Sequence, residues 1–228
     1  MGIVRGLKNI NRHVDAEEAK YANRGEDGPK TKWFKIADKQ SAKVIFLQEL
    51  DEESERFSQK NDLGFLAVEH KNPSNFMRKA LCTIDDDGAC FGCEKHDENW
   101  KAGWKQKTQL YVNVLVDNGT DEPFVAVLSQ GNGPKSITPT LLEYAGDDGV
   151  ITDKWFTIKR TGSGQTDTSY TLRAGKEHKE DVESFELFDL EKVVRQVPYA
   201  EQEAHYLGGQ SKDDTADTAA AGPEEKAW

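Results

Sequence analysis

The stretch "KTQLYVNVLVDNGTDEPFVAVLSQ", residues 107–130, decides the fold class. Its two halves, 107–117 and 123–130, are rich in the β-branched and apolar residues that favour strands. Asn118-Gly119 lies between them, and this dipeptide is typical of a turn between antiparallel strands. The stretch therefore predicts a β-hairpin.

Further strand-like segments lie on both sides of this hairpin, at residues 31–38, 41–50, 63–70, 154–162 and 168–175. The last two read as a second hairpin around a glycine-rich turn. One short helix is predicted from Thr138 to Tyr144, stopped by Gly146. Five to seven short strands with one inserted helix predict a mainly β protein with short helices, either a small β-barrel or a β-sandwich.

Composition divides the chain into four parts. Residues 1–30 are a polar arm with a short helix expected near 15–22, and residues 31–175 form the core. Residues 176–207 are a C-terminal helical segment whose apolar face is interrupted at Pro198. Residues 208–228 are acidic and poor in hydrophobic residues, so we expect a disordered tail.

The negative charge is concentrated near the C-terminal end. The chain has a net charge of −11, yet residues 176–228 alone hold 6 Lys and Arg against 14 Asp and Glu. A basic groove in the core can therefore coexist with overall acidity, and a polyanionic ligand is not excluded. No stretch approaches the roughly 18 apolar residues of a membrane helix, and no secretory leader is visible, so we expect a soluble cytoplasmic protein without a membrane partner.

All three cysteines lie in "CTIDDDGACFGCEKH", residues 82–96. Cys90 and Cys93 form a C-x₂-C step, in which two thiolates grip one ion from a tight turn, and Gly88 and Gly92 provide backbone freedom. Cys82 adds a third thiolate, and a histidine completes a closed Cys₃His set, which is typical of one structural zinc ion. Spacing does not decide between His70 and His96. The alternatives are idle buried thiols, or a redox pair, for which the βαβ context is missing.

Two segments interleave basic and aromatic residues, which is the pattern of a groove that stacks bases and tracks phosphates. The candidate contacts are Trp104, Lys105, Lys107, Tyr111, Trp155, Lys159 and Arg160. Trp33, between Lys32 and Lys35, has the same pattern. Each stacked base contributes roughly 1–3 kcal/mol. The competing interpretation is that these aromatic residues belong to the core.

Enzyme signatures are missing from the sequence. There is no phosphate-binding P-loop and no G-x-S-x-G, and His70 is followed by Lys71-Asn72 where a zinc deaminase has H-x-E. We therefore predict a protein that is not an enzyme. A second hypothesis is a zinc-stabilised interaction or regulatory adaptor that uses the acidic tail and Trp228 and binds no DNA.

The order His70-x₁₁-Cys82-x₇-Cys90-x₂-Cys93 resembles the zinc subdomain of the T-even-phage-type single-stranded DNA-binding, helix-destabilising proteins. The similarity extends over residues 31–172, including "WFKIADKQSAKVIFLQEL", "KQKTQLYVNVLV" and "WFTIKRTG". It implies an OB-fold β-barrel with a zinc subdomain inserted at about 70–100, and it favours His70 over His96 as the fourth ligand.

The same resemblance implies a function. The chain would be a shorter phage relative that coats single-stranded DNA, without strong sequence preference, during replication, recombination and repair in the infected bacterial cell. Its acidic tail would recruit replication or recombination proteins and compete with DNA for the groove, and the protein would self-associate on DNA. The basic N-terminal arm of the family is only loosely matched here, by Arg5, Lys8 and Arg12.

Overall fold

The structure is a computed structural model that describes residues 31–119, 122–164 and 167–208. All of the described residues belong to one compact unit. The arm predicted at 1–30, with its helix near 15–22, and the acidic tail from residue 209 onward lie outside the described residues.

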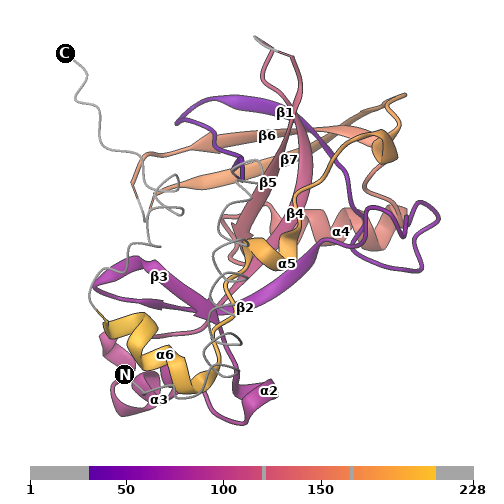
Figure 1. Ribbon diagram of the computed structural model, residues 1–228. Helices are drawn as coiled ribbons and strands as arrows, with labels where there is room; N and C mark the ends of the chain where they lie inside the picture. The colour runs from indigo at the N-terminus through magenta and orange to yellow at the C-terminus, as the bar shows by residue number, and fades with distance from the viewer. Residues whose placement is uncertain (1–30, 120–121, 165–166, 209–228) are drawn as a thin grey trace, which may run out of the picture. The chain divides into compact units, whose positions relative to one another are not determined.

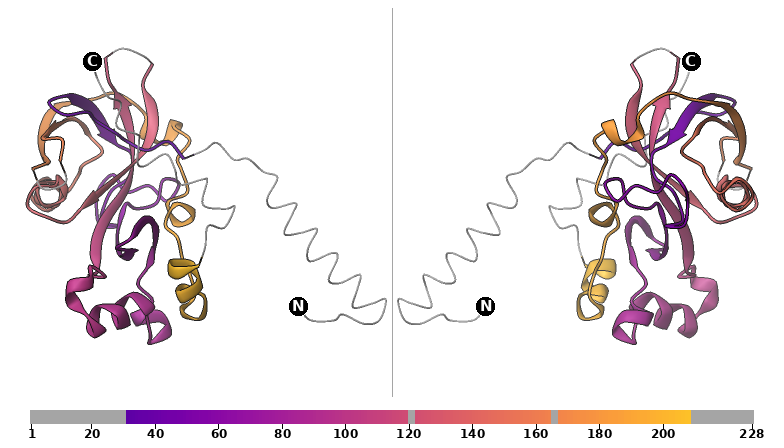
Figure 2. Two further views of the ribbon diagram at one scale, coloured as in Figure 1. Left: turned by 90° about the vertical axis from the view of Figure 1, so that its left-hand side faces the viewer. Right: turned by 90° about the vertical axis from the view of Figure 1, so that its right-hand side faces the viewer.

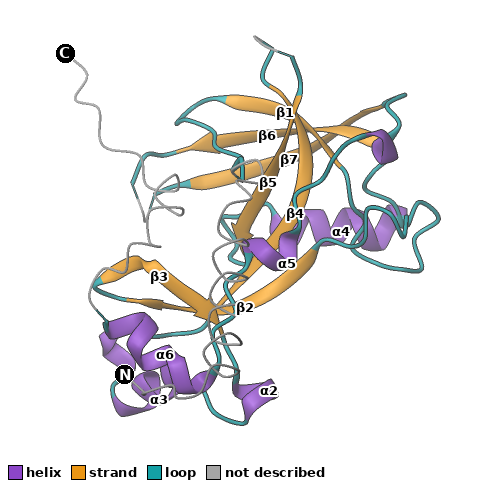
Figure 3. Cartoon of the chain, in the orientation of Figure 1, coloured by secondary structure: helices purple, strands orange, loops and turns teal. Residues whose placement is uncertain are grey.

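The described chain is mainly antiparallel β-sheet with a few short helices (Figures 1 and 3). The strands are β1 (Ser41–Phe46), β2 (Phe65–Asn72), β3 (Asn75–Leu81), β4 (Lys107–Asp117), β5 (Phe124–Gly131), β6 (Lys154–Thr161) and β7 (Ser169–Glu177). The α-helices are α2 (Ile84–Asp87), α3 (Phe91–Glu98), α4 (Thr138–Asp148), α5 (Leu190–Val193) and α6 (Tyr199–Leu207). Two 3₁₀ turns, η1 (Trp100–Ala102) and η2 (Val182–Ser184), complete the set. No helix among the described residues is long and apolar enough to cross a membrane.

β4 is the central strand of the sheet. The strand order is β3-β2-β4-β1-β6-β7, and β5 pairs with the other edge of β4. The first half of β4 pairs with β2, as at Phe65↔Tyr111, and its second half pairs with β1, as at Phe46↔Val114. Within the described residues β5 and β7 are not paired as strands, so the sheet is not closed. Near this gap, the backbone N–H of Tyr170 donates to the carbonyl of Lys135 at 2.7 Å.

The alternation of side chains along β4 separates two apolar layers. Leu110, Val112, Val114 and Val116 enter the main core with residues of β1, β5, β6 and β7, and α4 covers this core with Leu141. Tyr111 and Leu115 point to the opposite face. The core thus lies between the curved sheet and α4.

The segment from residue 182 to residue 207 runs along that opposite face and on to the cluster beside the cysteines (Figure 2). Its apolar residues enter three separate clusters, through Phe185 and Leu187, then Leu190 and Val194, then Val197 and Tyr206. A buried amide fixes its path, because Asn113 Nδ2 donates to the Phe188 carbonyl at 2.9 Å and Asn113 Oδ1 accepts from the Phe188 N–H at 3.1 Å. The segment forms two short helices, α5 and α6, and Pro198, where the sequence predicts an interruption of the helical face, is the N-cap of α6.

Three other sequence predictions differ from the structure. Residues 31–38 are not a strand, because only a single parallel bridge, Trp33↔Val127, joins this segment to β5. The helix at Thr138 continues through Gly146 and ends at Gly149, which adopts the left-handed conformation at φ 71°. β3 is an additional strand that the sequence pattern does not predict.

Candidate functional site

His70 and the three cysteines converge. One ligand-type atom from each of His70, Cys82, Cys90 and Cys93 lies within 4.8 Å of all the others. Cys93 Sγ is 3.3 Å from His70 Nε2 and 3.6 Å from Cys82 Sγ. Donor atoms around a tetrahedral zinc, with bonds of about 2.0 Å to nitrogen and about 2.3 Å to sulfur, stand about 3.5–3.8 Å apart. The four side chains therefore fit a metal ion such as zinc.

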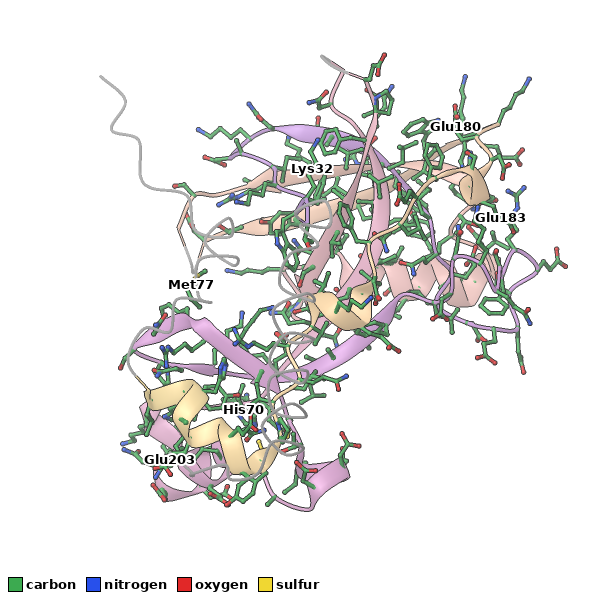
Figure 4. All side chains as sticks on the ribbon, in the orientation of Figure 1. Lys32, His70, Met77, Glu180, Glu183 and Glu203 are labelled. Atoms are coloured by element: carbon green, nitrogen blue, oxygen red, sulfur yellow. The ribbon has the colours of Figure 1, made fainter. Side chains whose placement is uncertain are left out.

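Local structure explains the spacing of the ligands. Cys82 directly follows β3, and its N–H bonds to the Val68 carbonyl of β2 at 2.8 Å, which brings it beside His70. The residues between Cys82 and Cys90 form the short helix α2, ended by Gly88 in the left-handed conformation at φ 70°. Cys90 is the N-cap of α3 and has an extended backbone conformation, and Cys93 lies in the first turn of that helix. Figure 4 shows sulfur beside the labelled His70.

Neighbouring groups orient the donors. His70 Nδ1 lies 2.6 Å from the Trp104 carbonyl, which can only accept, so Nδ1 carries the proton and Nε2 presents its lone pair to the sulfurs. The side-chain amide of Gln106 donates to both Cys82 Sγ and Cys93 Sγ, each at 3.3 Å. Such hydrogen bonds favour thiolates, which are the forms that bind metal.

The thiols share too little space to ionise together. Burial acts to raise the pKa of Cys90, but the nearby His70 side chain and hydrogen bonds with the backbone of Cys93 and Thr83 outweigh it and lower that pKa to about 6. Burial, the hydrogen bond with Cys82 and the charge of Cys90 raise the pKa of Cys93 to about 12. A bound dication supplies the positive charge that removes this conflict.

Gly92 is required by the close packing of His70. A Cβ built on Gly92 would lie 2.2 Å from His70 Cγ, so any side chain would displace the imidazole. The sequence pointed to Gly92 for backbone freedom, whereas the structure shows that the need is for space. His96 lies on α3 and does not belong to the four-residue cluster, which agrees with the choice of His70.

A second feature is a basic-aromatic groove of about 290 Å³ on the other side of the β2–β3 hairpin. Three aromatic residues and three lysines line it, namely Trp33, Phe34, Phe76, Lys35, Lys71 and Lys79, and Met77, Gln109 and Ser129 complete its walls. Met77, labelled in Figure 4, marks its β3 wall. Aromatic faces next to lysines are what a sequence-tolerant nucleic-acid groove requires.

The groove holds more positive than negative charge. Lys71 and Lys79 are direct cross-strand partners. Glu69, which is fully buried, accepts from Tyr111 Oη at 2.7 Å and from Lys79 Nζ at 3.3 Å. Burial first, and then the charge of Lys79, lower the pKa of Lys71; Glu69 opposes this and Lys107 adds to it. The Glu69 carboxylate thus lies near three ammonium groups, those of Lys71, Lys79 and Lys107, and this excess of positive charge favours an anionic ligand.

The larger cavity, about 500 Å³ between the β2–β3 turn and α6, lacks this character. Its one cationic side chain, Arg78, is 5% exposed and donates to the His205 carbonyl at 2.7 Å. Charge and aromatic faces therefore favour the smaller groove.

Two of the predicted base-stacking residues are in the core, which corrects the expectation. Trp104 is 8% exposed and packs edge-on against Phe91 and Tyr206, at centroid distances of 5.7 and 5.1 Å. Tyr111 is fully buried, and its hydroxyl donates a hydrogen bond to Glu69 and accepts one from Lys79. Tyr111 is enclosed by its apolar cluster, and Trp104 packs in the cluster beside the cysteines with only a small part of its surface toward the cavity of about 500 Å³.

The other predicted contacts are dispersed. Lys105 and Lys107 are exposed at the start of β4, and Lys107 lies close enough to influence Lys71. Trp155 is half-buried against the segment that follows β7, and Lys159 is exposed on the outer face of β6. Arg160 donates to the carbonyls of Ile36 and Gly162, at 3.1 and 3.2 Å. None of these five lines the groove.

Sequence reasoning misses most of the groove residues. The alternation around Trp33 and Lys35 points to that wall, but no pattern in the sequence singles out Lys71, Phe76 and Lys79. The usable signal is "KNPSN", residues 71–75, whose Pro, Ser and Asn predict a turn and hence a hairpin continuing into residues 75–81.

Comparison with models of known protein families, with curated proteins and with solved structures gives no match to this chain.

Proposed function

We propose that this protein binds single-stranded DNA, without strong sequence preference, in the groove between residues 33–35 and the β2–β3 hairpin. The observation that carries the proposal is the lining of that groove, where three aromatic residues occur together with three lysines in a chain of net charge −11. Local positive charge in an acidic protein is selective for a polyanion, and aromatic faces stack any base. Lys107 extends the positive charge beyond the groove.

We further propose that His70, Cys82, Cys90 and Cys93 hold one structural zinc ion. Four protein donors leave no open position, so such an ion would cross-link β2, the segment after β3, and α3 rather than perform chemistry. His70 and Lys71 are neighbours on β2, and so the same cross-link would hold the groove wall in place.

The resemblance to the T-even-phage-type helix-destabilising proteins accords with these two sites. On this proposal the core is an OB-fold, the protein coats DNA during replication, recombination and repair in the cytoplasm of an infected bacterial cell, and the acidic tail recruits partner proteins. The curved sheet with an apolar interior and the His-Cys₃ cluster support it.

Fluorescence titration with oligothymidylate tests the proposal. Trp33 lines the groove, so stacking should quench its emission, and the quenching should weaken with salt because bound cations are displaced from DNA phosphates. A Trp33→Phe variant should bind while losing most of the quenching. If the parent protein shows no salt-dependent binding, the zinc-stabilised adaptor is favoured instead.

A further inference from the structure

The outer face of β1, β6 and β7 carries a second group of cations. Side chains alternate along each strand, and Ala42, Val44, Phe156, Ile158 and Leu172 fill the core. The strand register then places the outward residues in two rows, Ser41–Lys159–Thr171 and Lys43–Thr157–Arg173. Hydroxyl and cationic side chains alternate along each row. They also alternate along each strand, from one row to the next. The six positions on β1, β6 and β7 carry no carboxylate, and β4 continues the second row with Asp117 opposite Lys43.

In the described part of the chain, none of the three cations forms an ion pair with an acidic residue on this face, although Asp117 of β4 lies opposite Lys43. Among the described residues, no ion pair joins Lys43, Lys159 or Arg173 to a carboxylate, and all three side chains are exposed. Strands about 4.8 Å apart, with same-face residues about 6.7 Å apart, place diagonal neighbours about 8 Å from each other. That spacing is close to the Debye length of about 8 Å at physiological salt, so the charges repel one another.

An anionic occupant relieves this repulsion, and the chemistry of the rows indicates which kind. Lysine, arginine and hydroxyl groups are the side chains that most often contact phosphate oxygens. A sheet face without exposed aromatic rings between its cations cannot stack bases. It suits a backbone whose charge repeats along its length.

We propose that this face binds the phosphodiester backbone of a nucleic-acid strand, as a contact separate from the groove. None of its six residues lines the groove. The inference rests on the proposed function, because it extends the path of a strand whose bases are held in the groove. Short ligands would occupy the groove alone, and longer ones would reach both.

The test compares a triple variant, Lys43→Ser/Lys159→Ser/Arg173→Ser, with a charge-matched control, Lys101→Ser/Lys192→Ser/Arg56→Ser. All six side chains are exposed, and the control residues lie outside β1, β6 and β7. Affinity is measured across salt concentrations for oligothymidylates of about 4 and about 16 nucleotides, which span the range of site sizes of single OB-folds. A groove variant, Trp33→Leu, serves as the reference for loss of base stacking.

We expect the triple variant to bind the long oligomer roughly tenfold more weakly at low salt, with a salt slope reduced by about 2, at about 0.7 per lost phosphate contact. Its affinity for the short oligomer should match that of the control, whereas Trp33→Leu should weaken both. Equal affinity of the triple variant and the control for the long oligomer would overturn the inference. Tighter binding of the long oligomer by the triple variant would also overturn it, because that result indicates an acidic segment of this chain as the occupant of the face. If the parent protein binds neither oligomer, the proposed function itself fails.

Discussion

Lys71 and Lys79 lie directly opposite each other on β2 and β3, two cations in register beside the buried carboxylate of Glu69. Like charges at directly opposed positions destabilise a sheet by up to about 1 kcal/mol. Only Lys79 has an ion pair to Glu69, at 3.3 Å, so the two lysines contribute differently to folding although both line the groove.

Replacing these lysines one at a time should therefore separate stability from binding. Lys71→Thr removes the repulsion and should raise the melting temperature by up to about 4 °C. Lys79→Thr leaves the buried carboxylate under-satisfied, at a cost of about 1–3 kcal/mol, and should lower the melting temperature by several degrees. Both variants should bind oligothymidylate more weakly, with a salt slope lower by about 0.7. Melting temperatures that shift in the same direction would contradict the assigned pairing.

Gly92→Ala should damage the metal centre specifically. The new Cβ would overlap His70 Cγ at 2.2 Å, so the imidazole must leave its position. We expect zinc affinity to fall by about 10–100-fold, the usual effect of disturbing groups that orient a ligand. Gly146→Ala is the control, because that glycine lies within α4 with open space around its Cβ. The control should gain about 0.5–1 kcal/mol of stability without any change in zinc affinity.

Removing a ligand should release the metal and lower stability. A zinc ion present at about 100 times its dissociation constant stabilises the folded chain by about 2.7 kcal/mol. Cys90→Ser should therefore lower the melting temperature by about 5–10 °C, and elemental analysis should show less than one zinc per chain. His70→Ala should behave in the same way, and His96→Ala should retain its zinc. The reverse outcome for the two histidines would show that the fourth ligand is His96.

Trp33 and Trp104 should respond differently to truncation. Trp33→Leu removes an aromatic wall of the groove and should weaken oligothymidylate binding by about 1–3 kcal/mol with a small effect on folding. Trp104→Leu removes a ring packed against Phe91 and Tyr206, so it should lower the melting temperature markedly while the folded protein still binds. Thermal melting and titration of the same samples check both expectations. A Trp104→Leu variant with parental stability but poor binding would restore the stacking role.

The strands that the sequence predicted well are those with strong alternation and a clear turn. β4 with β5, and β6 with β7, are both antiparallel pairs as expected. The sequence pattern did not predict β3, because its sequence "NFMRKAL" contains Arg78 and Lys79 and has little alternation of apolar and polar residues. The segment at 31–38 resembled a strand, yet only Trp33 forms a bridge, and residues 38–39 form the turn that leads into β1.

The metal cluster was predictable because thiol and imidazole side chains at close spacing have few other purposes. The groove was not, because its walls come from four separate parts of the chain, around Trp33, Lys71, Gln109 and Ser129. The sequence also could not decide whether Trp104 and Tyr111 are buried, because an amphipathic aromatic side chain gives the same sequence pattern whether it faces the core or a ligand.

The path of residues 182–207 has a consequence for biosynthesis. Gln202 accepts from the N–H of Phe91 at 2.9 Å and donates to Thr83 Oγ1 at 3.0 Å, and Tyr206 packs in the same lobe. While the ribosome still holds these residues, the sheet can form, but three apolar clusters stay exposed and the lobe around the cysteines has no complete interior. We expect the nascent chain to acquire its metal late, and to be most vulnerable to proteases and to association with other nascent chains until α6 has emerged.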